Sequence, residues 1–131
     1  MLNVDILNEV YGYLAAQPGL PEMLFRDDTA VRSGDYITPH WMPAKTLSPV
    51  ISNGGHIEQR GIFQINCYAK AGFNAELVLA GYTDAVIAAL PRALVLDKLQ
   101  IVGQAYATPV RSDGGYEVAA VTVEYIVIDS L

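Results

Sequence analysis

The sequence predicts a single α+β domain in which two amphipathic helices pack on one mainly antiparallel β-sheet, as a two-layer sandwich. Three observations favour this fold class. Residues 3–17 and 74–90 place apolar side chains at helical spacing, whereas residues 60–70 alternate apolar and polar side chains as a half-buried strand does. The last third of the chain is rich in β-branched residues and contains an Asp-Gly-Gly turn, which is typical of a β-hairpin. A chain of 131 residues, 52% hydrophobic and 17% charged, fits one folded domain.

The first expected element is a helix that begins at Asn3, a good capping residue, and ends before Pro18 and Gly19. Gly12 weakens its middle by roughly 1 kcal/mol relative to alanine, so burial of the apolar face must stabilise it. That face consists of residues spaced i, i+1, i+4, i+5, i+8 and i+9, namely Ile6, Leu7, Val10, Tyr11, Leu14 and Ala15.

A first strand is expected from Tyr36 to Pro43. Pro39 and Pro43 lack the N–H group that a strand ladder requires, which places this strand at a sheet edge or in an arm. The segment that follows contains the turn residues Asn53-Gly54-Gly55, so a long loop or hairpin arm is expected over about residues 40–60.

The clearest strand is residues 60–70, in which Phe63, Ile65, Cys67 and Ala69 point to one face. A second helix then begins at Asn74 and ends at Pro91. Phe73 precedes the cap and is expected to pack on Val78 as a hydrophobic staple. The predicted apolar face of this helix contains Val78, Leu79, Tyr82, Ala85, Val86, Ala89 and Leu90.

The last third predicts a hairpin of two strands, Leu99 to Thr108 and Tyr116 to Ile128, joined through Asp113-Gly114-Gly115. The second of these strands is apolar on both faces, except at Thr122 and Glu124, and therefore needs cover on both sides. Two helices are few for two sheet faces. Either the second face is short of cover, or a neighbouring subunit covers it.

Catalytic and metal-binding patterns are not found in the sequence. His40 and His56 fall in the proline- and glycine-rich region, where solvated loop histidines are expected, and no serine lies in a Gly-x-Ser-x-Gly elbow. Cys67 lies on the apolar strand face, which indicates a small core side chain. There is no Cys-x-x-Cys, His-Glu-x-x-His or calcium-loop motif, so we expect no metal, no cofactor and no enzyme.

The charge pattern argues against nucleic-acid binding, because 14 acidic and 8 basic residues give a net charge of −6. Residues 45–70 differ: three bases and one acid give this segment a charge of +2, which could pair with an acidic neighbouring subunit. Trp41, the single tryptophan, lies between prolines, and it either anchors an interface or packs on its own domain. The predicted interface residues are therefore Trp41, Lys45 and Arg60.

The expected compartment is a reducing cytoplasm, since a single cysteine excludes an internal disulfide. No apolar run approaches 18 residues, so no membrane span is expected. The first residues lack the basic start and apolar core of a secretion signal.

The order of elements resembles the small tail terminator (tail completion) proteins of long-tailed bacteriophages. The stretches that carry the resemblance are Gly34-Asp35-Tyr36-Ile37-Thr38-Pro39 before a variable loop, Gln59-Arg60-Gly61-Ile62-Phe63-Gln64-Ile65-Asn66-Cys67-Tyr68, Ala71-Gly72-Phe73-Asn74 opening a helix, Leu90-Pro91 closing it, and Val121-Thr122-Val123-Glu124-Tyr125-Ile126 after a hairpin turn. With the leading helix, the resemblance covers nearly all of residues 1–131, as one domain.

The resemblance implies a structural virion protein without catalytic residues or a cofactor, assembled in the host cytoplasm. Such proteins form a hexameric ring on the head-proximal end of the tail tube. The ring stops tube polymerisation at the length that the tape-measure protein sets, and then docks head-completion proteins. An acidic subunit would also suit a lumen through which DNA passes without specific binding.

Two alternatives remain open. The resemblance extends to neck and head-closure subunits of phages, which share small α+β folds. From a different class, a small hydrolase-like or ligand-binding α+β domain would use His40 or His56.

Overall fold

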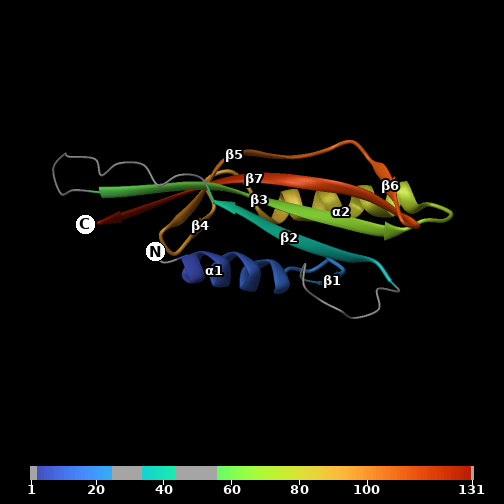
Figure 1. The fold of residues 1–131 in the computed structure, drawn as a ribbon, viewed down its shortest axis with the longest axis horizontal. Helices are drawn as coiled ribbons and strands as arrows, with labels where there is room; N and C mark the ends of the chain where they lie inside the picture. Colours follow the sequence, from blue (N-terminus) through green and yellow to red (C-terminus); the bar gives the residue numbers. More distant parts are fainter. Residues whose placement is uncertain (1–2, 25–33, 44–55, 131) are drawn as a thin grey trace.

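The computed structural model describes residues 3–24, 34–43 and 56–130. Within them, the strands form one seven-stranded sheet in the order β1-β2-β3-β7-β5-β4, and β6 also pairs with β7 (Figure 1). Every strand pair is antiparallel except β1–β2. The elements in chain order are α1 (Asn3–Ala15), β1 (Glu22–Met23), β2 (Tyr36–Pro43), β3 (His56–Lys70), α2 (Ala75–Ala89), β4 (Val95–Leu96), β5 (Leu99–Ala107), β6 (Arg111–Asp113) and β7 (Tyr116–Ser130).

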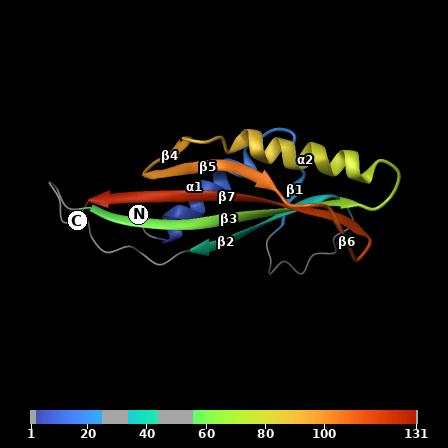
Figure 2. The ribbon, with the colours of Figure 1, turned by 90° about the horizontal axis from the view of Figure 1, so that it is seen from above.

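The predicted two-layer sandwich, with two helices packed on one sheet, is wrong. The structure is mostly sheet, and this sheet curls into a half-barrel. The helices consequently do not form one layer. In Figure 1, α2 lies behind the strands and α1 lies along their lower side. Seen from above, α2 lies to one side of the strands and α1 lies beneath them (Figure 2). Right-handed twist accumulates along the fifteen-residue strands β3 and β7, and the β5 bulge between Val102 and Tyr106 increases it.

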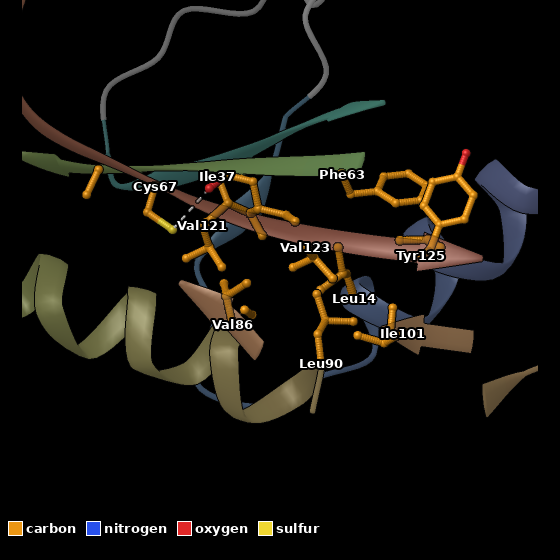
Figure 3. Close-up of a cluster of buried hydrophobic side chains, with 14 of the residues drawn as sticks. Leu14, Ile37, Phe63, Cys67, Val86, Leu90, Ile101, Val121, Val123 and Tyr125 are labelled. Carbon is orange, nitrogen blue, oxygen red and sulfur yellow. Dashed lines mark hydrogen bonds between the residues drawn. The ribbon is translucent and has the colours of Figure 1, made fainter. Parts of the chain in front are cut away.

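The core fills the concave face of the curled sheet. The predicted alternation in β3 is confirmed, because Phe63, Ile65, Cys67 and Ala69 are all buried there. The odd-numbered residues of β7 from Ala119 to Val127 join them from the neighbouring strand. Figure 3 shows part of this cluster between the strands and α2. The helices contribute Ile6, Val10, Leu14, Leu79 and Val86, and Leu90 joins them directly after α2.

The predicted bounds of β2 are confirmed, and its predicted edge position is confirmed in part. β1 lies outside β2 in the sheet, but among the described residues no strand pairs with the outer side of positions 38–43. β1 pairs only with Tyr36 and Ile37, and the N–H of Leu24 donates to the carbonyl of Ile37 at 2.9 Å. The odd-numbered residues of β2 therefore direct their backbone groups to the outer edge. Pro39 and Pro43 are both on that side, so the two missing N–H groups fall where β3 does not need them and where they discourage a further strand.

The predicted loop over residues 40–60 is partly wrong. Residues 40–43 belong to β2, and β3 already begins at His56, where it pairs with Ser130 at the end of β7. β7 is long enough to pair with β3 before residue 60, outside the stretch in which apolar and polar residues alternate clearly. The rest of the expected arm, residues 44–55, lies outside the described residues.

The predicted staple between Phe73 and Val78 is also wrong. The side chain of Phe73 is 97% exposed. Asn74 adopts a left-handed conformation, with φ 66°, and makes no side-chain capping hydrogen bond. This conformation turns the chain sharply before α2, so the residue before the cap points away from the first helical turn. The end of the helix agrees with the prediction, because α2 stops at Ala89, two residues before Pro91.

Candidate functional site

Trp41 packs within its own domain. It lies in β2 opposite Phe63 of β3, partly buried against the core. The indole N–H donates a hydrogen bond to Oη of Tyr125 at 2.7 Å. Of the two alternatives that the sequence leaves open, the structure shows the contact with the chain's own core, and an interface role for the exposed part of the side chain stays a prediction.

The other two predicted interface residues do not join Trp41 on one surface. Arg60 is exposed in β3 opposite Ile126, and it belongs to the even-numbered series of β3, on the convex face of the sheet. Trp41 faces the concave side. Lys45 lies outside the described residues, so its position relative to Trp41 and Arg60 stays a prediction.

The two histidines lie far apart. His40 is half-buried in β2 opposite Gln64, whereas His56 begins β3, eight residues before Gln64. At about 3.3 Å per residue, their backbones are separated by about 26 Å along the strand. The backbone positions of the two residues therefore do not support one catalytic site that uses both histidines. Among the described residues, no three histidine, cysteine, aspartate or glutamate side chains gather in a metal-binding group.

Cys67 is a core residue, as the sequence predicts. Its thiol is fully buried and donates a weak hydrogen bond to the carbonyl of Ile65 at 3.9 Å (Figure 3). Burial raises the pKa of the Cys67 thiol from its usual value near 9 to about 12, because the thiolate loses its hydration. A protonated, enclosed thiol is a poor nucleophile.

The burial of Cys67 predicts that its thiol is unreactive in the folded protein and that the stability of the fold decreases at high pH. Folded protein should leave Cys67 unlabelled by a disulfide reagent such as dithionitrobenzoate at pH 8, whereas protein in concentrated guanidinium should react at once. The unfolded chain releases the thiol proton near pH 9 and the native state near pH 12. Stability from this group is therefore complete below pH 9 and is lost as the pH rises toward 12, by about 1.4 kcal/mol per pH unit. Cys67→Ala should flatten this decline between pH 9 and 10, and rapid labelling of the folded protein would contradict the burial.

The convex face of the sheet is better covered than the sequence predicts. Near one end, Tyr36 stacks on Tyr68 with ring centroids 4.3 Å apart, and Tyr116 meets the ring of Tyr36 edge-on at 5.4 Å. Val118 and Thr38 are buried on this same face. Large aromatic side chains on neighbouring strands thus shield small ones between them, without a helix.

Hydrogen bonds of Asp35 connect the same end of the sheet to α2. Its carboxylate accepts the hydroxyl of Tyr82 at 2.6 Å and the backbone N–H of Lys70 at 2.8 Å. Loss of hydration, followed by the hydrogen bond to Asp35 and its negative charge, raises the pKa of Tyr82 to about 12. These bonds connect the residue before β2 with β3 and α2, so we assign a structural role to this cluster.

The most exposed apolar side chains lie at the start of α2. Phe73 is 97% exposed and Leu77 is 72% exposed. Both line a shallow hollow together with Glu76 and Glu117. We call these four residues the Phe73 surface. Phe73 and Leu77 are apolar residues four positions apart in the sequence. Sequence reasoning missed this surface, because the predicted staple placed Phe73 against its own helix.

A second shallow hollow lies beyond the other end of α2. Its lining includes Arg92, Ala93 and Gln100, and Val95 pairs with Gln100 in the β4–β5 ladder. Val95 is 58% exposed. We call Arg92, Ala93, Val95 and Gln100 the Arg92 surface. In the part of the chain that the structure describes, no helix is long and apolar enough to cross a bilayer.

Comparison with known proteins shows the fold and no function. No family model matches the chain, and no curated protein matches it. Among solved structures, one similar chain has a TM-score of 0.65 and 20% sequence identity, over 95% of this chain and 91% of that chain. At this identity the likeness establishes a shared fold over nearly the whole length of both proteins.

Proposed function

We propose that this protein is a structural subunit of a bacteriophage tail. It joins copies of itself in a ring at the head-proximal end of the tail tube, ends tube polymerisation and presents the surface on which the head docks. The order of the elements supports this proposal through its resemblance to tail terminators.

The observation that carries the proposal is the exposure of Phe73 and Leu77 on one side of α2. Burying such a side chain contributes about 1.5–3 kcal/mol, so leaving two of them in water is unfavourable unless another surface covers them. Clustered exposed apolar side chains mark protein–protein contacts more often than scattered ones do. A ring of identical subunits would provide this cover.

The charge of the chain is compatible with a ring around DNA. A net charge of −6 repels the phosphate backbone, so DNA would slide through the bore without being held. The tube protein, the tape-measure protein and the head-completion proteins would be the remaining partners.

Deletion of the gene tests the proposal. A phage that lacks this subunit should produce tails of excessive length that carry no heads, and the wild-type gene supplied in trans should restore tails of uniform length. Tails of normal length beside heads that leak DNA would assign the chain to the neck and contradict the proposal. Normal virions would contradict it as well.

A further inference from the structure

We propose that neighbouring copies join head to tail through the two ends of α2, with the Phe73 surface of one copy packed against the Arg92 surface of the next. This inference rests on the proposed function, because it names the contact that would build the ring.

The Phe73 surface combines apolar side chains with negative charge. Glu76 is exposed beside Phe73, and Glu117 reaches the same hollow from β7. The nearby cationic residues belong to the other face of the sheet. In the strand register, Lys70 of β3 lies opposite Tyr116 and Arg111 of β6 lies opposite Val118, and both of these β7 residues belong to the convex face. The hollow on the helix side is therefore apolar and acidic.

The Arg92 surface has the complementary character. Arg92 is the one charged residue among those that line its hollow. Val95 supplies an exposed apolar side chain, and β4 is a two-residue strand at the end of the sheet order. An apolar, acidic surface and an apolar, basic surface on the same chain attract one another between copies.

The positions of the two surfaces favour a head-to-tail contact. α2 has fifteen residues and is about 22 Å long. The residues of the Phe73 surface lie at its N-terminal end and those of the Arg92 surface beyond its C-terminal end, and Figure 2 shows the helix between these two parts of the chain. One copy cannot bring them together within itself. A contact between two different surfaces is heterologous, and repeating it closes a ring when the rotation between copies divides a full turn.

Disulfide trapping tests the contact directly. The variant Glu76→Cys, Arg92→Cys carries one new thiol on each surface, and the buried Cys67 does not compete. Oxidised glutathione should convert it, by thiol–disulfide exchange, into a ladder of multiples of the 14.2 kDa chain. Each single variant should give no ladder. The matched control Asp84→Cys, Arg92→Cys places the first thiol at another exposed position of α2 and should also give none.

Charge reversal gives a second test that needs no disulfide geometry. Glu76→Lys and Arg92→Glu should each reduce ring formation by at least tenfold in sedimentation, and the two changes combined in one chain should restore it. If wild-type rings form while the cysteine pair gives no ladder and the reversals have no effect, this contact is wrong and the ring survives. A disulfide dimer from Glu76→Cys alone would show a symmetric contact and overturn the inference. Wild-type protein that forms no ring, together with a deletion phage of normal tail length, would overturn both proposals.

Discussion

Val123→Asp should prevent the protein from folding. Val123 lies in the middle of β7, opposite Phe63 of β3, and only 1% of its surface is exposed. A carboxylate at this site would lose its hydration without a cation to pair with, which costs several kcal/mol. Since whole domains are stable by only about 5–15 kcal/mol, this loss removes most or all of the margin. Circular dichroism and Trp41 fluorescence should show an unfolded chain.

The neighbouring residue provides the control for this substitution. Glu124 is exposed on the opposite face of the same strand, so Glu124→Gln should change the free energy of unfolding by no more than about 0.5 kcal/mol. A Val123→Asp protein that melts at the wild-type temperature would show that β7 is not the central strand of the core.

Gly61→Ala should be the most destabilising change of a single methyl group. Gly61 lies opposite Tyr125 in the β3–β7 ladder, and a Cβ at position 61 would overlap the phenol ring of Tyr125. This ring is buried, and its Oη accepts the indole N–H of Trp41. Moving it costs about 1–3 kcal/mol of overpacking, and losing the hydrogen bond costs about 1 kcal/mol more.

Urea unfolding followed through the fluorescence of Trp41 measures this effect, because the indole lies beside the displaced ring. Gly12→Ala is the matched control: an added Cβ there meets nothing within 4 Å, and alanine favours helix α1 by up to about 1 kcal/mol. Equal stability of Gly61→Ala and the wild-type protein would contradict the packing of Tyr125 over Gly61.

Local patterns predict the elements well and their arrangement poorly. Pro39 and Pro43 predict that the outer side of β2 lacks a full partner strand, and the alternation from Phe63 to Ala69 identifies the buried face of β3. Both signals depend on neighbours in the chain. The curl of the sheet depends on twist summed over paired strands, which no single segment records. β1, β4 and β6 have two or three residues each, too few for a period to appear.

The two candidate surfaces could not be predicted from local sequence patterns either. Phe73 and Asn74 match a capping motif in sequence, but the left-handed conformation of Asn74 leaves Phe73 in solvent. Arg92 and Val95 lie in a stretch without periodicity, and only the fold shows that they occupy the opposite end of α2 from Phe73. Trp41 illustrates the converse, because its hydrogen bond to Tyr125 joins residues 84 positions apart.

Electron microscopy of tail-tube polymerisation tests most directly whether copies of this chain complete one another's surface. Tube subunits assembled with the purified protein should stop growing and carry a ring with a central bore on one end, whereas Phe73→Asp protein should leave the ends bare and the tubes growing. Tubes that elongate equally with and without the wild-type protein, and end without rings, would contradict the account.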